Sequence, residues 1–220
     1  MSTKPHAKAA IFDIDGTILD SMGVWETIDQ QIFNHLQIPM PVNYAKSIAG
    51  MQFHEIVQYT KQQFNIPLSN EELAQTWSHM AFDAYTNMVK PKAGAIEYLQ
   101  YLRSQNVPIA TATSLPKHLL SSVLQAVGCL DYFDELCCVE DVQNIEKTHP
   151  DVYQRAAKLL HVEESQCIVF EDLLIGIKAL RKTSMHVWAM LDESSRDDWQ
   201  EMRLIAEGCL YDFTNPPYSW

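Results

Sequence analysis

Two carboxylates stand one residue apart directly after an apolar run near the start of the chain. Asp13 and Asp15 follow the run Ala9–Phe12, and Gly16 comes immediately after them. In a continuing strand both aspartates would point to the same side, and the glycine permits a sharp turn. Two crowded carboxylates need a cation, and a hard, oxygen-liganded ion such as Mg²⁺ suits them. Because an isolated Asp-x-Asp is a weak motif, a plain acidic loop after a strand is the alternative.

A second apolar run ends in the same way. Cys167–Phe170 is followed by the adjacent carboxylates Glu171 and Asp172. Packing does not explain such a pair, because neighbouring unpaired carboxylates repel each other and lose solvation when they are buried. The second acidic strand end therefore favours a metal site over an acidic loop.

Groups suited to a phosphoryl oxygen occur between the two acidic pairs. Thr113 and Ser114 end the run that begins at Val107 and precede a predicted helix, where a hydroxyl and a backbone N–H can bind an anion. Lys147 precedes another predicted helix, and its ammonium would neutralise phosphate charge. Taken singly, the first pair is also typical of a helix cap, and a loop lysine is usually solvated.

The elements that would position these residues alternate between buried strands and amphipathic helices. Continuous apolar runs predict strands at Ala9–Phe12, Val107–Ala112, Leu136–Val139, Cys167–Phe170 and Val187–Met190. Apolar residues at helical spacing predict helices over Gly94–Ser104, Pro116–Val127, Asp151–Leu160 and Ile175–Leu180. This alternation predicts the α/β class, with a Rossmann-like parallel sheet covered by helices on both faces.

One segment interrupts the alternation. From Val24 to Leu36 an apolar residue recurs every four positions behind Ser21, which we expect to be the N-cap. Further helices are predicted over His54–Phe64 and Glu71–Asn87.

We therefore expect two domains. The α/β core domain comprises residues 1–20 and 90–220, and an all-helical cap domain is inserted over residues 21–89. An insertion after the first strand would lie over the carboxyl ends of the strands, where open α/β sheets bind their ligands. The cap is thus expected to act as a lid.

Composition excludes several kinds of partner. The chain has 220 residues, with 16 basic and 28 acidic side chains and a formal net charge of −12, which argues against nucleic acid and anionic membrane surfaces. No apolar stretch approaches the ~20 residues that span a bilayer, and no secretory signal is expected. The five cysteines form no Cys-x-x-Cys pair, which argues against a disulfide framework or zinc site and predicts a cytoplasmic location.

The four chemistry-bearing segments, in this order, resemble the motifs of the haloacid dehalogenase superfamily. The resemblance is to the branch with a helical cap after the first motif, which includes sugar-phosphate phosphatases and β-phosphoglucomutase-like proteins, and it runs from about Ala9 to Met190. Leu173 stands where a serine is common, and Thr148 and His149 depart from the usual Lys-Pro opening of the third motif. Neither departure touches a residue to which the family assigns chemistry.

The resemblance implies a role for each site residue. Asp13 would be the nucleophile that forms an aspartyl-phosphate, and Asp15 the acid that protonates the leaving alcohol and then the base that activates water. Mg²⁺ would be held by Asp13, Asp172, the backbone carbonyl of Asp15 and, directly or through water, Glu171. The phosphoryl oxygens would be bound by Thr113, the Ser114 amide and Lys147.

The expected activity is Mg²⁺-dependent hydrolysis of a small phosphate monoester, such as a sugar phosphate. A dehalogenase of the same superfamily is disfavoured, because displacement of a halide needs no acid and those relatives lack the second aspartate, which is Asp15 here. A mutase of the β-phosphoglucomutase type is the alternative, although Trp25 stands where the cap of that enzyme has a histidine. A third hypothesis is a catalytically silent member that serves as a binding or regulatory protein. The cap residues expected to face the substrate are Trp25, Gly50, Gln52 and His54. For Trp25, packing inside the cap is an equal alternative, and the sequence indicates no oligomeric state.

Overall fold

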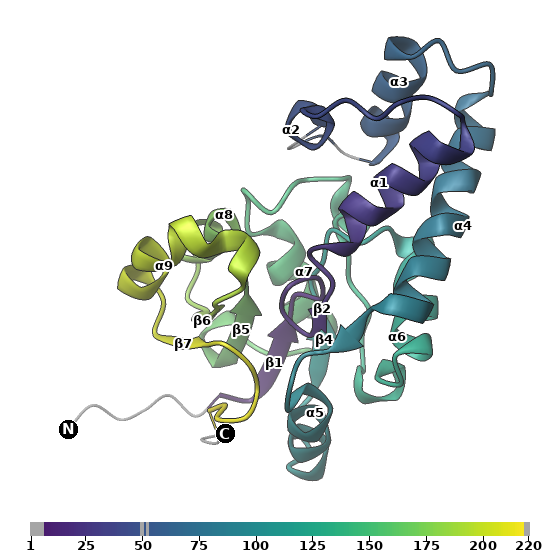
Figure 1. The fold of residues 1–220 in the computed structure, drawn as a ribbon. Helices are drawn as coiled ribbons and strands as arrows, with labels where there is room; N and C mark the ends of the chain where they lie inside the picture. Colours follow the sequence, from purple (N-terminus) through teal and green to yellow (C-terminus); the bar gives the residue numbers. More distant parts are fainter. Residues whose placement is uncertain (1–6, 49–50, 52, 218–220) are drawn as a thin grey trace. The chain divides into compact units, whose positions relative to one another are not determined.

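The computed structural model describes residues 7–48, 51 and 53–217 of the chain (Figure 1). The chain forms two compact units. One comprises Met1–Asp20 together with Lys90–Trp220, and the other comprises Ser21–Val89. Among the described residues, every helix is too short or too polar to cross a lipid bilayer.

A parallel sheet forms the centre of the first unit. Its strands are β1 (Ala9–Phe12), β4 (Ile109–Thr111), β5 (Cys167–Glu171), β6 (His186–Met190) and β7 (Gly208–Leu210). They lie in the order β4-β1-β5-β6-β7, and each neighbouring pair is parallel. Figure 1 shows β1 between β4 and β5. The predicted parallel α/β class is confirmed.

Helices and an aromatic cluster bury the two faces of this sheet. On one face, α7 (Asp151–Leu159), α8 (Leu174–Leu180) and α9 (Trp199–Ile205) pack on the apolar side chains of the strands. On the other face, the Phe12 and Phe170 rings stack with their centroids 4.7 Å apart, and Tyr98 of α5 (Ala95–Ser104) meets both. Burial on both faces explains why β1 and β5 are continuous apolar runs instead of alternating ones.

The strand predicted at Leu136–Val139 is wrong. Instead of a continuous ladder, the chain makes one isolated bridge just before this segment, between Glu135 and Ala110 of β4, and one within it, between Cys138 and Thr113. The Thr111 hydroxyl accepts the Cys137 N–H at 2.7 Å and donates to the Cys137 carbonyl at 2.9 Å. The chain then enters a 3₁₀ turn over Val139–Val142. The Thr111 side chain thus forms hydrogen bonds with the N–H and carbonyl of Cys137, which a regular strand would pair with the backbone of its neighbour.

Two short strands mark the points where the chain passes from one unit to the other. β2 (Leu19–Asp20) and β3 (Lys90–Pro91) pair in antiparallel fashion. Lys92, directly after β3, donates its N–H to the Ile18 carbonyl at 2.8 Å. Its Nζ lies 2.5 Å from Asp192 Oδ2, and both side chains are 9% exposed. The connecting strands are therefore tied to the first unit by a largely buried ion pair.

The regular elements in the described part of the second unit are all helices. It contains α1 (Val24–His35), α2 (Tyr44–Ile48), α3 (Phe53–Gln63) and α4 (Asn70–Met88), and α4 begins with a capping box between Ser69 and Glu72. The N-cap expected at Ser21 is wrong: the α1 cap residue is Gly23, and Ser21 contributes its backbone carbonyl to the Val24 N–H at 2.9 Å. The Val24 N–H at the start of α1 is therefore bonded to a backbone carbonyl, since the cap residue Gly23 has no side chain to accept it.

A buried carboxylate joins α1 to α4 inside this unit. Asp29 is 6% exposed, and its Oδ1 accepts a hydrogen bond from Trp77 Nε1 at 3.2 Å. Burial raises the pKa of Asp29 from 3.8 to about 6, although the Trp77 hydrogen bond opposes the shift. The ionised form is thus disfavoured in the folded state.

We expect Asp29→Asn to stabilise the protein above neutral pH. The folded state binds the Asp29 proton more tightly than the unfolded state does. The contribution of this proton to the free energy of unfolding is therefore fully present below about pH 4, and it is lost as the pH rises through about 6. Asparagine keeps the oxygen that accepts from Trp77. Each unit of pKa is worth about 1.4 kcal/mol, so at about pH 8 the gain should be on the order of 3 kcal/mol.

Urea unfolding of wild type and variant at about pH 4 and pH 8 measures this effect. Glu71→Gln, an exposed change on α4, is the control and should leave the difference between the two pH values nearly unchanged. A variant less stable than wild type at the higher pH would contradict the predicted cost of the buried charge.

Candidate active site

Asp13, Glu171 and Asp172 meet at the carboxyl ends of β1 and β5. Asp13 is the first residue after β1, and its N–H donates to the Phe170 carbonyl of β5 at 3.0 Å. Glu171 ends β5 and Asp172 follows it. Because β1 and β5 are parallel neighbours with Phe12 opposite Phe170, their ends coincide. One oxygen from each of the three carboxylates lies within 4.8 Å of the others.

Lys147 lies in the same cluster and is almost completely buried. Its Nζ is 2.6 Å from Asp13 Oδ1 and 2.6 Å from Glu171 Oε2, with the side chain 3% exposed. Burial alone would lower the pKa of Lys147, but the carboxylates of Asp13 and Glu171 outweigh it and hold that pKa well above its usual value. Lys147 is therefore an ammonium at neutral pH, in contact with two carboxylates.

Among the described residues, the cluster contains three acidic side chains and one basic side chain. Both carboxylate oxygens of Asp172 are buried, and neither has a hydrogen-bond partner among the described residues. Burial and then the charges of Asp13 and Glu171 raise the pKa of Asp172, and burial raises the pKa of Glu171 to about 7. Buried acceptors without donors call for a cation. The all-oxygen donor set fits a hard divalent ion such as Mg²⁺.

Thr113 and Ser114 lie beyond the end of β4, the other neighbour of β1. The N–H of Ala112 donates to the Phe12 carbonyl at 2.8 Å, which ties this end of β4 to β1. Thr113 is buried, and its Oγ1 accepts the Leu115 N–H at 3.0 Å. Ser114 is exposed, three residues before the first residue of α6 (Lys117–Ala126).

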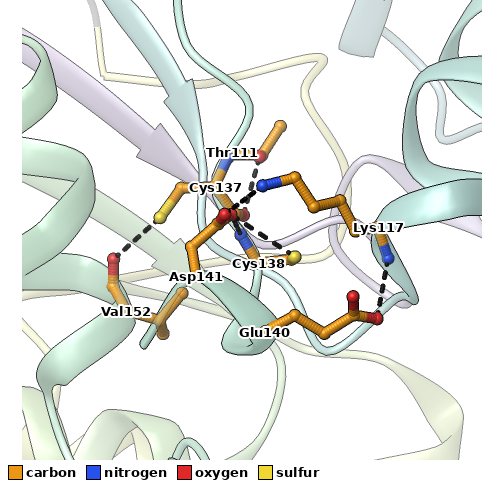
Figure 2. Close-up of polar contacts among 7 residues, drawn as sticks. All are labelled: Thr111, Lys117, Cys137, Cys138, Glu140, Asp141 and Val152. Carbon is orange, nitrogen blue, oxygen red and sulfur yellow. Dashed lines mark hydrogen bonds and ion pairs between the residues drawn. The ribbon is translucent and has the colours of Figure 1, made fainter. Parts of the chain in front are cut away.

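Figure 2 shows polar contacts that join the segment of residues 137–141 to Lys117 at the start of α6 and to Thr111 at the end of β4. The backbone N–H of Lys117 donates to Glu140 Oε1 at 3.0 Å, and the Lys117 ammonium pairs with Asp141. Asp141 Oδ2 accepts the Cys138 N–H at 3.1 Å. The next residue, Val139, donates its N–H to the Thr113 carbonyl at 3.0 Å. The loop after Cys137 therefore holds both the end of β4 and the start of α6.

Asp15 lies in a turn and not in a continuing strand. β1 ends at Phe12, and Asp15 is half-buried and forms an isolated β-bridge with Leu19. Gly16 has φ +73°, and its N–H donates a hydrogen bond to the Leu19 carbonyl at 2.9 Å. The positive φ at Gly16 is a conformation that side-chain-bearing residues rarely adopt. The strand geometry expected for the two aspartates is therefore wrong, since the chain leaves the sheet between them.

Of the four predicted cap residues, the structure describes Trp25 and His54. Trp25 is half-buried in the second unit, with its ring 6.0 Å from that of Tyr85. It also lines a cavity of about 120 Å³ together with Asp29, Ile48, Phe53, Ile56 and Trp77. His54 is exposed. Gly50 and Gln52 lie outside the described residues.

Sequence patterns did not single out one residue of the cluster. Tyr153 on α7 is fully buried, and its hydroxyl donates to Glu171 Oε2 at 2.9 Å. In the sequence, Tyr153 is one more large side chain on the apolar face of a helix. No local signal separates it from the core residues around it.

The chain belongs to the haloacid dehalogenase-like hydrolases, whose family profile matches residues 10–190. The predicted family is thereby confirmed.

Two curated relatives and one solved structure show the range of this similarity. The chain is 30% identical to validoxylamine A 7'-phosphate phosphatase of Streptomyces hygroscopicus subsp. limoneus, over 81% of this chain and 83% of that one. It is 28% identical to hexitol phosphatase B of Escherichia coli K12, over 84% of each. The crystal structure of β-phosphoglucomutase from Clostridium difficile has the same fold, with a TM-score of 0.73, 21% identity and coverage of 96% and 94%. The predicted enzyme class, a phosphoric monoester hydrolase, is confirmed by this kinship.

Proposed function

We propose that the protein is a Mg²⁺-dependent phosphatase that hydrolyses a small phosphate monoester, namely a sugar phosphate, through an aspartyl-phosphate at Asp13. One observation carries the proposal: Asp13 touches the buried Lys147 ammonium, and it also lies close to Asp172, whose two carboxylate oxygens have no hydrogen-bond partner among the described residues. With a cation bound at Asp13 and Asp172, the nucleophilic carboxylate would have that cation as well as the Lys147 ammonium beside it, which suits attack on an anionic phosphate ester.

A divalent cation bound here would neutralise phosphate charge and the charge that develops during phosphoryl transfer. The carboxylates of Asp13 and Asp172 are its proposed ligands, joined by the backbone carbonyl of Asp15, and Glu171 lies beside them. This donor set agrees with the preference of Mg²⁺ for oxygen ligands.

The remaining roles belong to the chain's own groups. Lys147 and Thr113, with the Ser114 amide, would bind the phosphoryl oxygens. Asp15 would donate a proton to the leaving alcohol and later take one from the attacking water. The net charge of −12 repels phosphate esters, so Lys147 and the cation must reverse the sign locally.

Hydrolysis is favoured over a mutase reaction by the charge of the inserted helical unit. A mutase must hold a second phosphate, yet Lys46 and Lys61 are the only Lys or Arg residues between Ser21 and Val89. Trp25 offers a ring in place of a cationic side chain. We propose that this unit is a cap that excludes water and contacts the sugar.

The proposed substrate class follows the relatives, one of which is named for hexitol phosphates. We also propose a cytoplasmic location, which the five free thiols support.

Phosphate release from a panel of sugar, polyol and nucleoside monophosphates, with Mg²⁺ or with chelator, tests the function. We expect release from at least one sugar phosphate with Mg²⁺ and none with chelator. Conversion of β-glucose 1-phosphate to glucose 6-phosphate without free phosphate would favour the mutase. No turnover of any ester would favour a silent binding member.

A further inference from the structure

The Glu171 carboxylate has three donors in the structure. Its Oε2 receives the Tyr153 hydroxyl at 2.9 Å and the Lys147 ammonium at 2.6 Å. Its Oε1 accepts the backbone N–H of Leu173 at 3.1 Å. The side chain is 0% exposed. Glu171 is thus oriented by protein groups on both oxygens, whereas Asp172 beside it has no such donor among the described residues.

Tyr153 contacts the two charged partners at once. It lies in the first turn of α7, shortly after Lys147, and its ring centroid is 5.6 Å from Lys147 Nζ. The aromatic ring and the hydroxyl therefore act together, since the ring face attracts the ammonium and the hydroxyl donates to the carboxylate.

α8 confines this arrangement from the other side. A Cβ on Gly176 would lie 2.5 Å from the Tyr153 hydroxyl oxygen and 2.8 Å from Glu171 Cδ. Real Cβ atoms do not approach other atoms so closely. A larger residue at position 176 would therefore clash with the Tyr153 hydroxyl and the Glu171 side chain. For the same reason, neither of these groups can move toward α8.

We propose that Tyr153 is a positioning residue that makes Glu171 the counter-ion of Lys147 and leaves direct metal ligation to Asp13 and Asp172. An oxygen that accepts from both a hydroxyl and an ammonium has little electron density left for a cation. Held in this way, Glu171 keeps Lys147 against Asp13, where the ammonium can neutralise an incoming phosphate. The catalytic consequence rests on the proposed function, whereas the metal-binding consequence does not.

Tyr153→Phe tests this role, because it removes only the hydroxyl. We expect kcat for the best ester to fall about tenfold, equivalent to about 1.4 kcal/mol, with KM changed less than threefold. Isothermal titration with Mg²⁺ alone should give an affinity at least as high as that of wild type, because the freed Glu171 oxygen becomes available to the cation. A tenfold weaker Mg²⁺ affinity would overturn the proposal, since the hydroxyl would then be supporting Glu171 as a ligand.

Tyr98→Phe is the matched control. Tyr98 is a buried tyrosine of the same unit whose hydroxyl donates to the Pro217 carbonyl at 2.8 Å, so its loss should leave kcat and Mg²⁺ affinity unchanged. A Tyr153→Phe chain that matches this control in kcat, or that does not fold, also overturns the proposal.

A double-mutant cycle with Glu171→Gln shows whether Tyr153 acts through Glu171. We expect Tyr153→Phe to lower kcat little further in the Glu171→Gln background, because the partner of the hydroxyl has already lost its charge. Fully additive losses would contradict the proposed route. If the wild-type protein hydrolyses no ester, the proposed function fails, and the Mg²⁺ titrations still decide the role of Tyr153.

Discussion

Asp13→Asn is expected to lower kcat for the best phosphate ester by roughly a thousandfold or more. An amide oxygen is a poor nucleophile, and the variant also removes the charge that faces Lys147 at 2.6 Å. The substitution is nearly isosteric, so the neighbouring strands β1 and β5 need not move. The loss should therefore appear in kcat, while the circular dichroism spectrum stays that of wild type.

Phosphate release with and without Mg²⁺ measures the effect. Asp131→Asn, an exposed change in the same unit, is the matched control and should retain wild-type turnover. Turnover by Asp13→Asn within tenfold of wild type would remove Asp13 from the role of nucleophile and with it the aspartyl-phosphate.

Lys147→Met is expected to affect stability as strongly as activity. It leaves Asp13, Glu171 and Asp172 buried together without the ammonium, and breaking a buried ion pair by removing one partner typically costs about 3–5 kcal/mol. We expect a clear loss of unfolding free energy in chelator. Ester hydrolysis should also fall by roughly a hundredfold or more, because the variant lacks one of the two positive charges that we propose to face the phosphate.

Mg²⁺ should restore stability to this variant more than it stabilises wild type, because the added cation then offsets three uncompensated carboxylates. Thermal unfolding in chelator and in Mg²⁺ measures both effects. Lys158→Met, an exposed change on α7, should behave as wild type. A Lys147→Met protein as stable as wild type in chelator would show that the carboxylates are not ionised together in the folded state.

Some elements of the fold could be predicted from the sequence, because they depend on local patterns of residue type. Strands β1 and β5 are short and buried on both faces, so each appears as a continuous apolar run. The same rule failed at Leu136–Val139, where an equally apolar run forms one isolated bridge instead of a ladder. What differs there is the Thr111 hydroxyl, which reaches across from β4 to Cys137, and no pattern within the run reveals it.

The sequence by itself determined the α/β alternation, the helical interruption and the acidic residues that end two strands, because residue type and periodicity act over a few neighbouring positions. Only the tertiary structure decided that Lys147 is buried between Asp13 and Glu171, and that Tyr153 donates to the same Glu171 oxygen. Asp13 and Lys147 are 134 positions apart. Their meeting depends on strand order and on the packing of α7 against the sheet, and burial then changes the properties of their charged groups in ways that no local pattern encodes.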